Sequence, residues 1–205
     1  FKQMFNQEYI LSKASDLAKE IHGHDASGHD FHHILRVVHM AEHLAHAEKS
    51  EEVDLFLVRL ASYLHDIDDP KLSDGKVQRL AMFFAKYEVP INYQERLVDI
   101  IDNLSYSSFL KGKVEQTIEG KIVQDADRLD ALGAIGIART FSYGGFKGRL
   151  IDDEDKQATI HHFSEKLLKL KDLMNTKEAK RIAKSRHQFL VRFLKEYEKE
   201  KQLLD

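Results

Sequence analysis

Helix-breaking residues are scarce along this chain, and their scarcity limits the folds open to it more than any other feature. The 205 residues include two prolines and ten glycines. Apolar residues recur three and four positions apart along nearly the whole length, as at Ile10, Ala14, Leu17, Ala18 and Ile21, which is the spacing of one buried helix face. No sustained alternation with a period of two, the pattern of a half-buried strand, competes with it. The sequence therefore predicts an all-α fold.

Interruptions rich in Gly, Pro or Ser divide this pattern into nine predicted helices. We expect them over residues 4–22, 30–48, 51–67, 74–88, 92–104, 117–133, 135–142, 154–174 and 177–203. None of the interruptions has the composition of a flexible linker, and no repeat of fixed period is present. We therefore expect one compact helical domain that spans residues 1–205.

The composition excludes several classes of function. The absence of cysteine rules out disulfides, thiolate catalysis and Cys-rich zinc sites. Apolar runs are far shorter than the roughly 18 to 20 residues of a membrane span, and no signal pattern opens the chain, so we expect a cytoplasmic protein without a membrane partner. A net charge of −3 without long blocks of one sign argues against an extended nucleic-acid surface. A small phosphorylated ligand and a homodimer both remain open.

Histidine is abundant, with 12 copies in the chain, and imidazole is the commonest metal-binding side chain. Within the predicted helix 30–48, the 3.6-residue turn places only His33 at the edge of the apolar stripe. His29, four residues earlier, could share a cleft with it. The remaining histidines of this helix project from the opposite side: His32, His39, His43 and His46.

One stretch of this helix matches a protease motif. His39, Glu42 and His43 spell H-x-x-E-H, the pattern of the inverted zinc proteases. Because both histidines face away from the apolar stripe, we expect a solvated helix surface rather than a zinc site.

A second histidine stands at the end of an apolar helix, in the pair His65-Asp66, which Asp68 and Asp69 follow. Adjacent helical residues diverge by about 100°, so the pair can share one ion only over the arc between them. The alternative is a histidine that titrates on the surface beside the acids of the next turn.

A third segment carries two acids in apolar surroundings. Asp127 and Asp130 stand at i and i+3, on one helix face. Carboxylates in such surroundings need either a cation or a partner such as Arg128.

Together these elements spell the pattern H…HD…D, formed by His33, His65-Asp66 and Asp127. On this pattern and on its flanking segments, 29–37, 64–67 and 124–145, the chain resembles the HD-domain metal-dependent phosphohydrolase superfamily. Within that superfamily it is similar to the bacterial branch of YpgQ- and YedJ-like proteins. The resemblance implies an all-helical fold with a metal-binding core over residues 25–140, on which C-terminal helices over 154–203 pack.

The resemblance also implies roles for individual residues. The metal ligands would be His33, His65, Asp66 and Asp127, with Asp130 as the alternative ligand. Asp66 and Asp69 would be the catalytic residues. The expected substrate contacts are His29, Arg36, Lys76, Arg128, Arg139 and His162. Residues 143–149 have the glycine content and charge of a loop that closes over a substrate, and the alternative is an ordinary surface turn.

Two imidazoles and two carboxylates form a mixed nitrogen and oxygen ligand set. Such a set suits Mn²⁺, which we expect, with Fe²⁺, Co²⁺, Zn²⁺ or Mg²⁺ as alternatives. The resemblance implies a pyrophosphohydrolase that converts nucleoside or deoxynucleoside triphosphates to monophosphate and pyrophosphate. The alternatives are a nucleoside 5′-monophosphate phosphatase and a nucleotide-sensing module without turnover.

Overall fold

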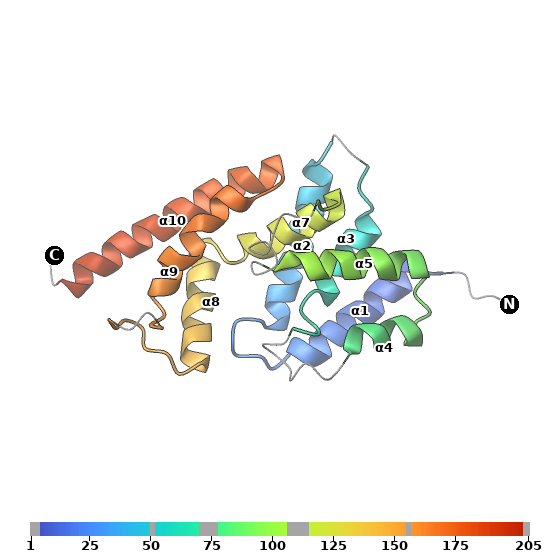
Figure 1. Ribbon diagram of the computed structural model, residues 1–205, viewed down its shortest axis with the longest axis horizontal. Helices are drawn as coiled ribbons and strands as arrows, with labels where there is room; N and C mark the ends of the chain where they lie inside the picture. The colour runs from blue at the N-terminus through green and yellow to red at the C-terminus, as the bar shows by residue number, and fades with distance from the viewer. Residues whose placement is uncertain (1–4, 50–51, 70–77, 106–114, 155–156, 203–205) are drawn as a thin grey trace.

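The protein is built from helices, as the computed structural model shows (Figure 1). The structure describes residues 5–49, 52–69, 78–105, 115–154 and 157–202, and these contain no strand. The predicted all-α fold is therefore confirmed. Within the same ranges, no helix combines the length and the apolar character that a membrane span needs.

The helices of the described residues follow one another along the chain. Their bounds are α1 Gln7–His22, α2 Phe31–Ala47, α3 Leu55–Leu64, α4 Arg79–Lys86, α5 Ile91–Leu104, α7 Ile118–Leu129, α8 Gly133–Phe146, α9 His161–Glu165, the 3₁₀ helix η1 Leu167–Leu173, and α10 Lys177–Lys201. Several begin at a residue whose side chain accepts a backbone N–H of the first turn. Asp30 caps α2, Asp54 caps α3 and Thr117 caps α7 in this way.

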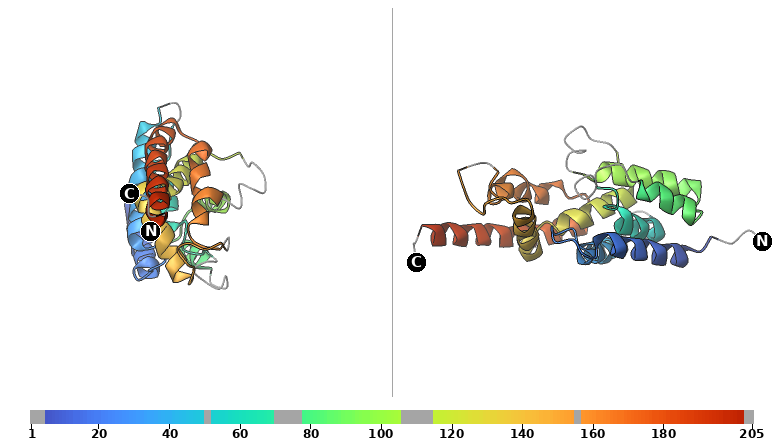
Figure 2. Two further views of the ribbon diagram at one scale, coloured as in Figure 1. Left: turned by 90° about the vertical axis from the view of Figure 1, so that its left-hand side faces the viewer. Right: turned by 90° about the horizontal axis from the view of Figure 1, so that it is seen from below.

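Three helices form the centre of the molecule. α2 packs against both α3 and α7, and α3 also contacts α7. α1, α4 and α5 lie toward one end, and α8, α9 and α10 toward the other (Figures 1 and 2). α10 contacts α8, η1, α7 and α2 and then continues outward as a long rod. The site residues of α2, α3 and α7 are thus brought together by the most closely packed part of the fold.

The predicted helix over 154–174 is wrong. The chain there is irregular over 152–154 and 157–160, and it then forms the five-residue α9 and the 3₁₀ helix η1. Several apolar residues of this segment are nevertheless buried: Phe163, Leu167, Leu170 and Met174.

The predicted break and loop after residue 142 are also partly wrong, because α8 continues through Gly144 and Gly145 to Phe146. Gly144 lies so close to the chain that follows α8 that an added Cβ would collide with Oγ1 of Thr159. The glycine there permits close packing and does not end the helix. The turn follows the helix instead, at Gly148, whose φ is +66°.

Candidate metal centre

Four of the residues singled out in the sequence meet where α2, α3 and α7 pack together. His33 lies in the first turn of α2 and is fully buried. His65 directly follows α3, and Asp66 lies in the turn after it. Asp127 comes from the last turn of α7. The packing of these three helices therefore assembles the group from distant parts of the sequence.

The two imidazole rings face the same two carboxylates. Nε2 of His33 lies 3.6 Å from Oδ2 of Asp66 and 3.6 Å from Oδ1 of Asp127. Nε2 of His65 lies 3.4 Å and 3.7 Å from the same two oxygens. Two nitrogen and two oxygen donors thus surround one small volume.

The hydrogen bonds made by Nδ1 of each imidazole show which ring nitrogen carries the proton. Nδ1 of His65 lies 2.8 Å from the carbonyl oxygen of Ser62, and Nδ1 of His33 lies 2.7 Å from Oδ2 of Asp130. Because a carbonyl and an ionised carboxylate only accept hydrogen bonds, each Nδ1 carries the proton. In each neutral ring the lone pair is therefore on Nε2, and both lone pairs point into the group.

These donors fit a divalent cation. Nε2 of His33 and of His65 are buried and make no hydrogen bond with any residue that the structure describes, although buried polar atoms nearly always have a partner. Ligands about 2.1 Å from one ion stand roughly 3.0 to 3.5 Å apart, close to the separations found here. His33, His65 and Asp127 each offer one ligand atom within 4.8 Å of the others, and Asp66 faces both rings. The group is thus able to hold a metal ion.

The electrostatics of the centre also favour positive charge. Burial by itself would lower the pKa of His65, but Asp66 and Asp127 raise this pKa well above its usual value. Burial would raise the pKa of Asp66 and of Asp127, but the neighbouring histidines hold both pKa values well below their usual range. The carboxylates therefore stay ionised, and a cation between them and the rings is stabilised.

Asp130, the alternative ligand of the sequence analysis, lies on the other side of His33. Its carboxylate accepts a hydrogen bond from Nδ1–H of His33 and two hydrogen bonds from Arg36, at 2.8 and 3.0 Å. Nη1 of Arg139 lies 3.3 Å from the same carboxylate. Burial would raise the pKa of Asp130, but His33 and Arg36 lower it to about 2. Asp130 thus orients His33, as carboxylates commonly do for metal-binding histidines.

Arg36 and Arg139 are therefore held by protein groups. Arg139 also donates from Nε to the carbonyl of Gly28 at 2.7 Å, and from Nη1 to the backbone carbonyl of Asp130 at 3.1 Å. These contacts position the site residues and leave the expected phosphate-binding role of both arginines as a prediction.

The other expected site residues are more dispersed. The ring of His29 lies 6.1 Å from that of His33, next to the centre. Asp69 follows Asp66 by one turn, and its N–H donates to the Asp66 carbonyl at 3.2 Å. Arg128 donates to the carbonyl of Leu173 at 2.6 Å, which connects it to η1. His162 lies in α9, and Lys76 falls outside the described residues.

Sequence reasoning missed a buried histidine near the centre. His22, in the last turn of α1, is 1% exposed, and its Nε2 has no hydrogen-bond partner among the described residues. Burial lowers the pKa of His22. The charge of Asp66 opposes this shift, and the charges of His65 and His33 add to it. His22 continues the buried positions Ala14 and Ala18 at intervals of four. The position of His22 on the apolar face of this helix could therefore have predicted its burial.

The H-x-x-E-H residues lie on an exposed face of α2, as the sequence analysis expects. His39 and His43 are exposed. Nε2 of His43 pairs with Glu178 of α10 at 2.9 Å, and Glu42 pairs with Arg59.

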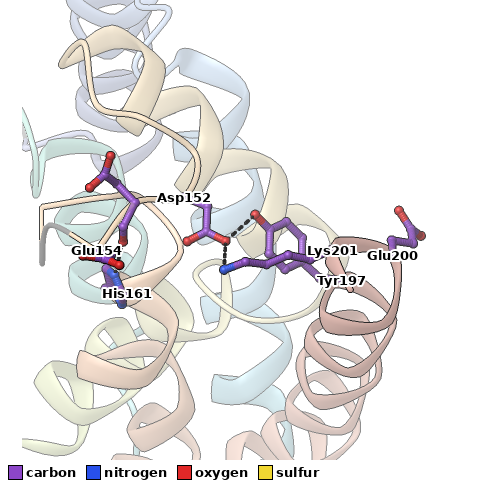
Figure 3. Close-up of a pocket in the computed structure, with 7 residues that line it drawn as sticks. Asp152, Glu154, His161, Tyr197, Glu200 and Lys201 are labelled. Atoms are coloured by element: carbon purple, nitrogen blue, oxygen red, sulfur yellow. Dashed lines mark hydrogen bonds and ion pairs between the residues drawn. The ribbon is translucent and has the colours of Figure 1, made fainter. Parts of the chain in front are cut away.

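A surface pocket opens elsewhere, beside the end of α10 (Figure 3). Oδ2 of Asp152 there accepts hydrogen bonds from Tyr197 at 3.1 Å and from Lys201 at 2.7 Å. The pocket is lined by Asp152, Asp153, Glu154, His161, Tyr197, Glu200 and Lys201. It shares no residue with the candidate metal centre.

Nearly the whole chain is similar to proteins of known sequence and structure. The protein YpgQ of Bacillus subtilis (strain 168) is 41% identical over 185 residues, which cover 86% of each chain. A crystal structure from Lactobacillus plantarum superposes with a TM-score of 0.87 at 35% identity and covers 98% of this chain and 100% of its own. An HD-superfamily hydrolase from Bacillus thuringiensis is 40% identical, with a TM-score of 0.72 over 96% of this chain and 99% of its own.

YpgQ has also been solved in complex with ADP. That structure superposes with a TM-score of 0.77 at 33% identity and covers 95% of this chain and 96% of its own. The HD domain family is matched by residues 30–132, a range that includes His33, His65, Asp66 and Asp127. On these matches and on the geometry of its centre, the chain belongs to the HD domain family.

Proposed function

We propose that this protein is a metal-dependent phosphohydrolase that cleaves nucleoside or deoxynucleoside triphosphates to monophosphate and pyrophosphate. The observation that carries the proposal is the geometry of the two histidines. Nε2 of His33 and Nε2 of His65 make no hydrogen bond with the described residues, and both face the carboxylates of Asp66 and Asp127. The likeness to an HD-superfamily hydrolase supports hydrolysis, and the ADP complex of YpgQ supports a nucleotide.

The four side chains would hold the divalent cation, for which we propose Mn²⁺. Such a cation lowers the pKa of water and neutralises charge on a phosphoryl oxygen. Asp130 keeps His33 in the tautomer that binding requires, and the carbonyl of Ser62 does the same for His65. We propose that Asp69, one turn after Asp66, accepts the proton that the attacking water loses.

Product analysis tests this function. The purified protein would be incubated with nucleoside mono-, di- and triphosphates, with and without Mn²⁺, beside Asp66→Ala and Asp127→Asn. We expect pyrophosphate from triphosphates only with metal, and at least a hundredfold loss in both variants. His39→Ala is the matched control, because this exposed histidine lies outside the centre and its loss should leave the rate unchanged.

Two outcomes would replace the proposal. Orthophosphate released from monophosphates alone would identify a nucleoside 5′-monophosphate phosphatase. Metal and nucleotide binding without any product would identify a sensing module.

A further inference from the structure

The segment that joins α1 to α2 contains a chain of hydrogen bonds that ends next to the metal centre. Oγ of Ser27 lies 2.9 and 2.8 Å from the two carboxylate oxygens of Asp25, and 3.1 Å from Nδ1 of His29. Ser27 is 1% exposed. An acid, a hydroxyl and an imidazole are thus connected in series.

The number of available protons fixes the direction of these bonds. The carboxylate of Asp25 accepts the backbone N–H groups of Ser27 at 3.0 Å and of His29 at 2.8 Å, so it acts as an acceptor. The single hydroxyl proton of Ser27 is therefore donated to Asp25, and its oxygen accepts from His29. Nδ1 of His29 must carry a proton, and in the neutral ring Nε2 is then a hydrogen-bond acceptor.

The segment is held at two points by α8. The hydroxyl of Ser142 in α8 donates to the carbonyl of Ala26 at 2.7 Å, and Nε of Arg139 donates to the carbonyl of Gly28 at 2.7 Å. Gly28 has φ +93°, and a Cβ there would lie 3.3 Å from the carbonyl oxygen of Arg139. Only glycine readily allows this conformation and approach.

The imidazole held in this way lies beside the candidate ligands. Its ring is 6.1 Å from that of His33 and 5.9 Å from that of Tyr143, edge to face in both cases. The imidazole of His29 is thus held beside a candidate ligand, and an acid fixes the position of its proton through a hydroxyl.

We propose that Asp25 and Ser27 are positioning residues that fix His29 in the Nδ1–H tautomer, so that its Nε2 accepts a hydrogen bond from the attacking water. This role rests on the proposed function. An acceptor on one side of the water turns a hydrogen toward itself and leaves an oxygen lone pair directed at phosphorus. His29 contacts the nucleophile, whereas Ser27 and Asp25 act through His29.

The tautomer is measured without any turnover. Long-range ¹H–¹⁵N spectra of the ¹⁵N-histidine-labelled full chain would be recorded for the wild type, for Ser27→Ala and for the matched control Ser142→Ala. We expect Nδ1–H for neutral His29 in the wild type and in Ser142→Ala, and a shift toward Nε2–H in Ser27→Ala. A wild-type proton on Nε2, or an unchanged tautomer in Ser27→Ala, overturns the proposal.

A double-mutant cycle measures the catalytic consequence. For Ser27→Ala we expect kcat to fall about tenfold, with KM and Mn²⁺ affinity changed less than twofold. In the His29→Ala background the same substitution should have no further effect, because a residue that acts through His29 loses its role with it. Equal losses in both backgrounds would show that Ser27 only stabilises the loop, and would overturn the proposal.

The two experiments separate this inference from the proposed function. If the wild-type protein hydrolyses no nucleotide, the proposed function fails and the assigned water contact of His29 fails with it. The tautomer spectra then still decide whether Asp25 and Ser27 position the ring.

Discussion

At the scale of single residues, Asp130 is the group on which the geometry of His33 depends. It is 4% exposed, and it receives hydrogen bonds from His33 and Arg36 and lies close to Arg139. A buried carboxylate with several charged partners does not reorient freely. The direction of the His33 lone pair is therefore fixed before a metal arrives.

Asp130→Asn should weaken metal binding. The amide keeps the size of the carboxylate but removes the charge, and its NH₂ group cannot accept from Arg36. We expect Mn²⁺ affinity, measured by isothermal titration calorimetry, to fall about 10- to 100-fold. Asp99→Asn, at an exposed position of α5, serves as the control. If Asp130→Asn bound Mn²⁺ as tightly as the wild type, the orienting role of Asp130 would be refuted.

The sequence indicated which residues would gather, but not how each would meet His33. The i and i+3 spacing correctly places Asp127 and Asp130 on the same side of α7, where both reach α2. Which of them meets Nε2 and which meets Nδ1 depends on how α7 packs on α2. The same packing brings Arg36 and Arg139 to Asp130, and no pattern within one helix contains that information.

At the scale of elements, α8 contains two neighbouring glycines, Gly144 and Gly145, whose surroundings differ. A Cβ on Gly144 would collide with Oγ1 of Thr159, whereas a Cβ on Gly145 would meet no atom of the described residues within 4 Å. Both residues lie inside the helix. One glycine is required by packing, and the other only lowers helix propensity.

The two glycines therefore predict opposite changes in stability. Gly144→Ala should lower the free energy of unfolding by about 1 to 3 kcal/mol, because α8 and the Thr159 segment must separate. Gly145→Ala should raise it by about 0.5 to 1 kcal/mol through helix propensity. Urea unfolding followed by circular dichroism measures both. Equal effects of the two substitutions would contradict the packing role of Gly144.

Most helices could be predicted from the sequence because apolar spacing records which residues are buried. Apolar spacing does not show whether the backbone forms the hydrogen bonds of an α-helix or of a 3₁₀ helix. Phe163, Leu167 and Leu170 are buried as a helix pattern requires, yet their backbone forms α9 and a 3₁₀ helix. In the same way, the glycines of α8 look like a break until the position of Thr159 is known.

At the scale of the whole molecule, we propose that the chain is a single domain. One core cluster includes buried residues from α1, α3, α7 and α10, among them Leu11, Leu57, Ile122 and Leu190. Asp125 of α7 also accepts hydrogen bonds from Asn175 and Thr176, just before α10, at 2.7 to 2.9 Å. The C-terminal helices are therefore joined to the helix that carries Asp127.

Metal binding should stabilise this unit as a whole. A cation that binds only the folded state adds about 2.7 kcal/mol at a hundredfold excess over Kd. We expect calorimetry to show one unfolding transition whose Tm rises with Mn²⁺ in the wild type and returns on chelation. Asp127→Ala should unfold in one transition with no Mn²⁺ response. A second, metal-independent transition in the wild type would argue for separate domains.

The long sequence separation within the site bears on how the protein is made. His33 and its carboxylate partner Asp130 are 97 positions apart. While a ribosome synthesises the chain, both histidines of the centre emerge well before α7 does, and at that stage they offer only a partial binding site. Selective capture of the metal therefore has to wait until α7 has emerged and packed, so the loaded centre marks a chain whose central helices are already in place.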